Sequence, residues 1–194
     1  MSNLLETAIS SGAGALFGAL GAWAIVTFLD RARRPRVEVD FSGGYPFEDD
    51  ALTLQGGQHR YLRVKIKNVG RSTAKNCKVF VRSIELSSAG GARAKLNTYD
   101  LMQTNWVPRE AGIRQLDIPA KMDFLADIAM DANNNGRRSA IPIFPIQNDR
   151  VQRFLEHVGV FSLDVVIISD NAETVTTTIR FRFNGQPLGL FAEM

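Results

Sequence analysis

The chain has 194 residues, of which 45% are hydrophobic, so it is long enough for one ordinary domain with a packed core and an appendage. Its net charge is +3, but four arginines flank one apolar segment, and from Val37 onward 19 basic residues stand against 18 acidic ones. Because nucleic-acid-binding domains carry a clustered basic excess, we expect no nucleic-acid partner. The single cysteine, Cys77, excludes an intramolecular disulfide and fits a reducing compartment.

The first expected element is a transmembrane helix. The 22 residues from Ala8 to Leu29 carry no charge, and a helix of that length spans about 33 Å, close to the hydrocarbon thickness of a bilayer. A cleaved signal peptide and a buried soluble helix are the alternatives. The opening "MSNLLE" has no Lys or Arg, which a signal peptide requires. We therefore expect residues 1–30 to be an N-terminal membrane anchor and residues 31–36 to be a basic juxtamembrane linker.

The basic residues beside this segment predict its orientation. All four follow the apolar run and none precedes it: Arg31, Arg33, Arg34 and Arg36. Because loops rich in Lys and Arg stay on the cytoplasmic side, we expect a single-pass protein of the inner or plasma membrane with its C-terminal domain in the cytoplasm. At the membrane surface each arginine contributes about 1 kcal/mol of attraction to anionic lipid, so membrane lipid is an expected partner.

One side of the expected helix consists of small residues. A helical projection places Gly14, Gly18, Gly21 and Ala22 in one arc of about 120°, opposite bulky side chains such as Trp23. This spacing allows two helices to approach closely in lipid, so the chain is a candidate for self-association through this face. The alternative is that these residues reflect only the common use of Gly and Ala in membrane helices.

The remainder, 37–194, has the period-2 pattern of β-strands joined by turns rich in Gly, Asn, Asp and Ser. One segment, "NDRVQRFLEHV" at 148–158, instead has the apolar stripe of a helix. Short strands without alternating long helices predict an antiparallel β-sandwich. The expected strands are 37–41, 61–68, 77–86, 114–118, 123–130, 141–146, 160–169 and 174–183.

The stretch "YLRVKIKNVGRSTAKNCKVFV", Tyr61 to Val81, resembles the strand-turn-strand of bacterial immunoglobulin-like sandwiches of the adhesion-related CARDB type. In that family an alternating strand ends in Asn-x-Gly and a second alternating strand follows a small residue, here near Ala74. The resemblance implies an immunoglobulin-like sandwich. Extracellular adhesion, which it also implies, conflicts with the cytoplasmic orientation, and no functional residue is transferred.

Motifs that could carry chemistry are weak. "DANNNG", Asp131 to Gly136, fills half of a calcium-loop pattern, but its twelfth position is Pro142, and Asn-Gly is typical of a hairpin turn. Asp123, Asp127 and Asp131 share one face of a strand if it is regular, where solvation explains them. His59 and His157 lack a catalytic signature, and Cys77 alternates with core positions. We expect no catalytic residue, no metal and no cofactor.

Aromatic residues in irregular segments are the remaining candidates for partner binding: Tyr45, Phe47, Tyr99 and Trp106. Each could equally close the edge of the core. The sequence as a whole predicts a non-catalytic binding or scaffold module, anchored in the membrane, for an unidentified protein. The alternative is a defence- or toxin-like effector that senses a ligand and whose glycine-lined helices cluster in the bilayer.

Overall fold

A computed structural model describes residues 21–30, 33–44, 46–52, 58–87, 93–107, 113–134, 137–142, 157–186 and 189–193. Within these ranges, the side chains of 51–59, 96–102 and 132–142 are not described. The chain divides into two compact units, Met1–Arg34 and Pro35–Met194.

In the first unit, residues 21–30 form a helix whose large apolar side chains are exposed. They are Trp23, Ile25, Val26, Phe28 and Leu29. Among the described residues, no helix has both the length and the hydropathy needed to cross a membrane. Residues 8–20 of the expected anchor lie outside the described part of the chain.

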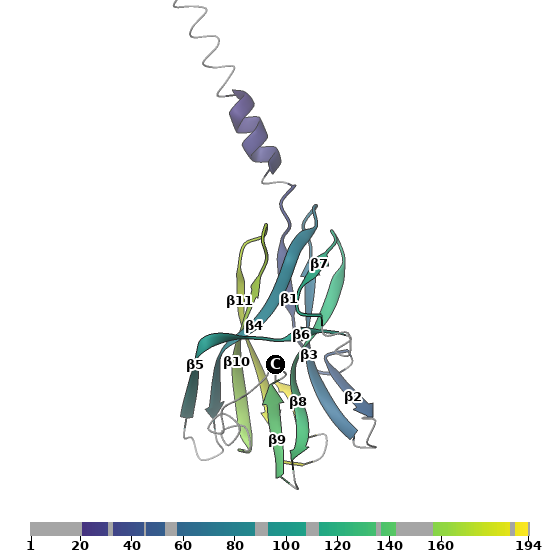
Figure 1. Cartoon of the computed structure of the whole chain (residues 1–194), viewed down its shortest axis with the longest axis vertical. Coiled ribbons are helices and arrows are strands. Elements are labelled where there is room, and N and C mark those ends of the chain that lie inside the picture. The colour runs from purple at the N-terminus through teal and green to yellow at the C-terminus, as the bar shows by residue number, and fades with distance from the viewer. Residues whose placement is uncertain are drawn as a thin grey trace, which may run out of the picture. The chain divides into compact units, whose positions relative to one another are not determined.

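The second unit is mainly β, with two antiparallel sheets (Figure 1). In the first sheet the order is β1-β3-β8-β6, with β2 also paired to β3 and β9 to β8; in the second it is β12-β11-β10-β4-β5, with β7 paired to β4. The strands are β1 (Val37–Asp40), β2 (Glu48–Leu52), β3 (Gln58–Asn68), β4 (Ala74–Ser87), β5 (Arg93–Gln103), β6 (Asn105–Trp106), β7 (Leu116–Ile118), β8 (Asp123–Asn134), β9 (Arg137–Pro142), β10 (Gly159–Ile168), β11 (Val175–Phe183) and β12 (Leu190–Glu193).

The expected antiparallel β architecture is confirmed, and each of the eight expected strands overlaps an observed one. Strand β9 begins four residues earlier than expected, because it pairs directly back along β8, with Asn134 opposite Arg137. β8 and β9 are thus the two arms of a hairpin, as expected for "DANNNG", whose residues 135–136 lie outside the described part of the chain. The helix expected at 148–158 lies outside the described residues except for its last two positions.

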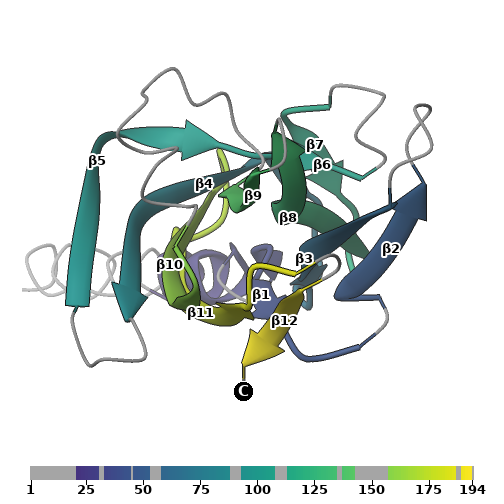
Figure 2. The ribbon, with the colours of Figure 1, turned by 90° about the horizontal axis from the view of Figure 1, so that it is seen from below.

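The core lies between the two sheets and follows the strand alternation. Leu62, Val64 and Ile66 of β3 are fully buried, as their period-2 spacing predicts. From the other sheet, Phe161 of β10 and Phe181 of β11 stack with ring centroids 5.2 Å apart. Figure 2 shows β12 lying at the edge between β11 and β3, which it contacts.

One end of the sandwich is held by Asn68, the last residue of β3, whose side chain is buried. Its Oδ1 accepts hydrogen bonds from the backbone N–H groups of Gly70 (3.0 Å) and Arg36 (3.3 Å). Its Nδ2 donates to the carbonyl oxygens of Ser72 (2.7 Å) and Ile118 (2.8 Å). The Asn of the Asn-x-Gly sequence thus joins the start of β1, the β3–β4 turn and the end of β7.

Candidate functional site: a charged cluster at one edge of the sandwich

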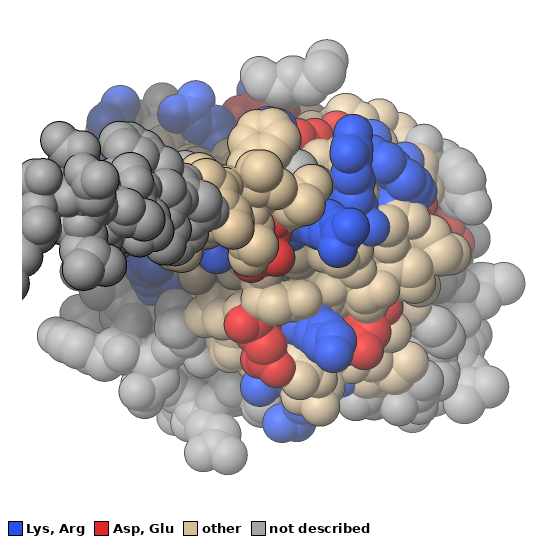
Figure 3. All heavy atoms as spheres, turned by 90° about the horizontal axis from the view of Figure 1, so that it is seen from above, with Lys and Arg blue, Asp and Glu red and all other residues tan. Residues whose placement is uncertain are grey.

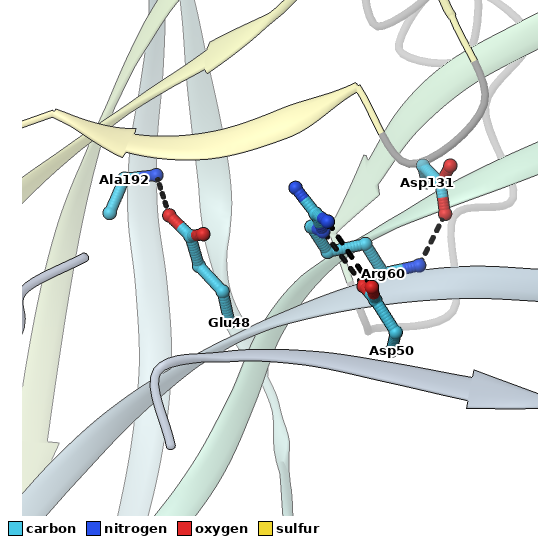
Figure 4. A network of polar contacts seen from close by, with 5 residues as sticks. All are labelled: Glu48, Asp50, Arg60, Asp131 and Ala192. Atoms are coloured by element: carbon cyan, nitrogen blue, oxygen red, sulfur yellow. Dashed lines mark hydrogen bonds and ion pairs between the residues drawn. The ribbon is translucent and has the colours of Figure 1, made fainter. Parts of the chain in front are cut away.

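A cluster of charged side chains lies where the edges of the two sheets meet (Figure 4). Arg60 of β3 makes two bonds to Asp50 of the neighbouring β2, Nε to Oδ1 at 2.7 Å and Nη2 to Oδ2 at 3.2 Å. Glu48, also on β2, accepts a bond of 2.7 Å from the backbone N–H of Ala192 on β12. The guanidinium carbon of Arg60 lies 5.0 Å from the ring centre of Phe191, which is also on β12. Both contacts cross from one sheet to the other.

A β-bulge decides which acids join this cluster. Between β3 and β8, Leu62 pairs with Ala129 but Arg63 pairs with Asp127, so β8 has an extra residue at Ile128. The extra residue shifts the alternation, and Asp131 falls on the inner face while Asp127 stays on the outer face. Asp131 is fully buried and accepts a bond of 2.6 Å from the backbone N–H of Arg60.

The expectation of one solvated face for the three aspartates is therefore wrong for two of them. Asp123 is exposed, but Asp127 and Asp131 are both buried. A strict alternation cannot anticipate the bulge, which depends on the partner strand.

The electrostatics of the cluster follow from its ion pair. The hydrogen bonds from Arg60 hold the pKa of the Asp50 carboxyl below its ordinary value, against a smaller opposing effect of burial. The same bonds raise the pKa of Arg60, helped by the charges of Asp50, Glu48 and Asp131. Both groups therefore stay charged throughout the physiological range.

A second ion-pair group lies on the outer face of the same sheet. The Nε of Arg63 donates to Asp127 Oδ1 at 2.9 Å, and its Nη1 donates to Asp49 on β2. Burial opposes the charge on Arg63, but the bonds and charges of these two acids outweigh it and raise its pKa. Two consecutive acids of β2, Asp49 and Asp50, thus bind Arg63 and Arg60 of β3, one pair on each face of the sheet.

The contacts of Asp50 with Arg60 and of Glu48 with Ala192 hold β2, β3 and β12 together, and we call this group the clamp. Every described carboxylate of the two groups accepts a bond from an arginine or a backbone N–H group. The bond from Ala192 also occupies a donor on the edge strand β12, which limits pairing with another chain there. Among the described residues, no set of three or more His, Cys, Asp and Glu side chains is placed to hold a metal ion.

Two of the expected partner-binding aromatics belong to the core. Trp106 is 1% exposed and its Nε1 donates to the carbonyl oxygen of Cys77 at 3.2 Å; Phe47 is 6% exposed. Neither side chain presents a surface that a partner could contact, so each closes the edge of the core. Tyr45 lies outside the described residues, and the side chain of Tyr99, on β5, is not described.

The expected helix-packing and membrane-surface residues are only partly described. Gly21 and Ala22 are exposed in helix 21–30, whereas Gly14 and Gly18 lie outside the described residues. Arg33 and Arg34 are exposed and Arg31 is not described. Arg36 belongs to the sandwich unit, where its Nη2 lies 3.3 Å from the Glu38 carboxylate.

Cys77 and the histidines form no catalytic pair within the described residues. The thiol of Cys77 is fully buried, as its place in the strand alternation predicts, and burial raises its pKa to about 11. His157 is exposed, and the side chain of His59 is not described.

The clamp residues Asp50 and Arg60 were missed by sequence reasoning because they belong to regions with no apolar alternation. The sequence of β2, "EDDAL", has one signal that could have found it: its three consecutive acids are followed by a strand that carries Arg60 and Arg63 on opposite faces. Such pairing becomes evident only once β2 is known to lie beside β3.

No family model matches the chain, and no curated protein matches it. One solved structure, described as the X-ray structure of Northeast Structural Genomics Consortium target SoR45, is similar over 82% of this chain and 90% of its own, with 15% identity and a TM-score of 0.31.

Proposed function

We propose that the chain is a single-pass membrane protein whose N-terminal helix anchors a non-catalytic, cytoplasmic, immunoglobulin-like β-sandwich that binds another protein. The observation that carries the proposal is the apolar helix ahead of the sandwich. In its described part, 21–30, apolar side chains such as Trp23 (69% exposed) and Phe28 (71% exposed) have no protein cover. Lipid is the solvent in which a charge-free stretch from Ala8 to Leu29 is stable.

The order of the strands supports the immunoglobulin-like part of the proposal. In one sheet β3 lies between β1 and β8; in the other β10 lies between β11 and β4, with β5 beyond β4. Immunoglobulin-like sandwiches have this arrangement, with the first, second and fifth major strands in one sheet and the third, sixth and seventh in the other. The resemblance of Tyr61–Val81 to CARDB-type domains falls on β3, the following turn and β4.

Partner binding is supported by the polar end of the sandwich that carries the start of β1 and the turns after β3, β7 and β10. Figure 3, which views the molecule from above, shows Lys and Arg interspersed with Asp and Glu on this end. Exposed residues there include Arg71, Lys75, Lys121, Asp170 and Glu173. Interspersed charges of both signs suit recognition of a protein surface of matching pattern. Tyr45 and Tyr99 remain candidate contacts.

Cysteine labelling in cells tests the anchor and its orientation. The buried Cys77 leaves the parent chain unreactive in its folded state, so a Lys121→Cys variant introduces one exposed thiol. A membrane-impermeant maleimide should label Lys121→Cys only after a bacterial host's spheroplasts are lysed, and alkaline carbonate should leave the chain in the membrane pellet. Labelling in intact spheroplasts would refute the orientation, and release by carbonate would refute the anchor.

Photocrosslinking tests partner binding separately. A photoreactive phenylalanine analogue at Tyr45, at Tyr99 or at Lys121 should yield one shared crosslinked protein species from native membranes. The matched control is the same analogue at Phe191, which is 39% exposed and lies on β12, away from this end of the sandwich. If no position gives a species above this control, the binding role is wrong, whatever the result for the anchor.

A further inference from the structure

A small polar hollow lies on the outer face of the second sheet, away from the charged clamp. It crosses four neighbouring strands, β11, β10, β4 and β5, and has a volume of about 150 Å³. This is several times the 10–15 Å³ that one water molecule needs. Its lining residues are Glu85, Ser87, Arg93, Val160, Ser162 and Arg180.

The strand register explains why the sheet is hollowed here. Ser162 of β10 lies opposite Arg180 of β11, Val160 lies opposite Ser87 of β4, and Ser87 lies opposite Arg93 of β5. Residues paired in this way point to the same face. Three short side chains on the two central strands therefore form a half-buried floor, with a long, exposed arginine on each outer strand.

The two arginines are available to a ligand. Of the other charged groups nearby, Glu85 binds Lys95 at 2.7 Å, and Arg182 binds Glu193 at 2.6 Å. Glu193 lies opposite Arg180 across the strand pair, but its carboxylate bonds to Arg182; within the described part of the chain, no carboxylate forms an ion pair with Arg93 or Arg180. The neighbouring acid Asp164 is engaged as well, because it accepts bonds from Ser83 and Thr178.

The hollow thus offers two guanidinium groups and two hydroxyls. The Ser87 and Ser162 side chains make no hydrogen bond to any described residue. Three strand spacings separate the outer strands by about 14 Å, and Arg93 and Arg180 are two residues apart along the strands, so their long side chains can flank one small anion diagonally. We propose that this hollow binds an oxyanion, a phosphoryl group above all, with Arg93 and Arg180 supplying charge and the serines supplying hydroxyl donors.

A phosphoryl group matches these donors better than a carboxylate does. It carries up to two negative charges and three terminal oxygens, which can accept hydrogen bonds from both guanidinium groups and from a serine hydroxyl at the same time. The site goes beyond the proposed binding of a protein and does not depend on the anchor.

Titration of inorganic phosphate into the full chain in a non-ionic detergent tests the site, with sodium chloride at matched ionic strength as the reference. Phosphate should shift the NMR signals of the Arg93 and Arg180 side-chain N–H groups and of the Ser87 and Ser162 amides, saturably. Arg180→Gln and Arg93→Gln should each weaken binding by about tenfold or more, the usual effect of losing a charge-assisted bond. Both side chains are exposed, so the fold should be retained.

Arg182→Gln is the matched control. Arg182 is on the same strand as Arg180, but Glu193 occupies it, so phosphate binding should change by less than about twofold. Phosphate shifts no larger than those with chloride, together with no shifts from phosphatidic acid in the second arm below, would overturn the proposal. Equal weakening in all three variants would also overturn it, because it would indicate general attraction to positive charge.

A second arm identifies the source of the phosphoryl group. The full chain is placed in nanodiscs of phosphatidylcholine with or without phosphatidic acid, in phosphate-free buffer. Shifts at the same four residues only with phosphatidic acid would support the site with a lipid headgroup as its ligand. Shifts only with free phosphate would support it with a soluble ligand, and shifts in neither arm would overturn it.

Discussion

Replacing Asn68 with alanine should destabilise the sandwich more than its size suggests. The side chain makes four hydrogen bonds to backbone groups of three separate segments. The bonds to the Gly70 N–H and the Ile118 carbonyl are buried, and the bonds to the Arg36 N–H and the Ser72 carbonyl are partly buried. Asn68→Ala leaves all four backbone groups without this partner.

The magnitude follows from which of these groups water can reach. A buried polar group left without a partner costs about 1–3 kcal/mol, whereas a partly exposed one regains a bond to water at little net cost. The two buried groups therefore predict a loss of about 2–6 kcal/mol in the free energy of unfolding. Domains of this size are stable by about 5–15 kcal/mol, so the loss is a large share of the total.

Urea unfolding in a mild detergent measures this change. Trp106 is buried and reports on the sandwich, and a Trp23→Phe background removes the exposed second tryptophan. With an unfolding slope of about 2 kcal/mol per molar urea, the midpoint should fall by about 1 M or more. Asn184→Ala is the control, since it removes one exposed bond, from the Gln186 N–H, and should cost under about 1 kcal/mol. If the two variants shift the midpoint equally, the reasoning about buried groups is wrong.

Four further outcomes can be measured. Gly159→Ala should destabilise the sandwich by about 1–3 kcal/mol in the same assay, because its Cβ would lie 2.6 Å from the Ser87 carbonyl oxygen; Gly43→Ala, whose Cβ would have no neighbour nearer than 3.9 Å, should be neutral within about 0.5 kcal/mol. Cys77 should react with Ellman's reagent at pH 8 only after unfolding, since burial raises its pKa to about 11; rapid reaction of the folded chain would contradict its burial. The Ser83 and Thr178 hydroxyls lower the pKa of Asp164 in the folded chain. The stability that these bonds contribute is therefore fully present above the pKa of Asp in the unfolded chain, about 3.9, and is lost as the pH falls through the lower pKa of Asp164 in the folded chain. Ser83→Ala should therefore be less stable than the parent at pH 7 but closer to it at pH 2, and a difference that does not change with pH would exclude this origin. Crosslinking between N-terminal helices in a membrane should fall sharply for Gly18→Leu and stay unchanged for Leu16→Ala. Equal crosslinking in the two variants would mean that the glycine face makes no contact between helices.

The strands that the sequence predicts are those whose burial is one-sided and regular. In β3 and β11, inward apolar residues alternate with outward polar ones, and each strand pairs along most of its length. The sequence misses four strands, β2, β5, β6 and β12. Two of them have other causes of order. β2 is acidic and is held by arginines of β3, and β12 is a short edge strand whose Ala192 N–H is bound by Glu48. The order of β2 comes from ion pairs with the next strand, and that of β12 from a residue distant in sequence; apolar periodicity contains neither.

The candidate sites were harder to predict than the fold for the same reason. An aromatic residue in an irregular segment gives the same signal whether it faces solvent or the core, and Trp106 proves to be buried because β6 pairs it beside Ala126. The acids of β8 give the signal of one face, but the bulge at Ile128 divides them. In both cases the deciding fact is the register with a partner strand.

Register also connects the clamp and the polar hollow. At the clamp, Asp50 lies opposite Arg60, and at the hollow Glu85 lies opposite Lys95, so that the charges of each pair cancel. In the hollow, Arg93 lies opposite Ser87, and Arg180 lies between Ser162 and Glu193, whose carboxylate binds Arg182 instead. A serine provides no charge and little stabilisation across a strand pair, whereas an acid at either position would. Among the described residues, no carboxylate bonds to Arg93 or Arg180, and a small anion bound in the hollow would neutralise their charge.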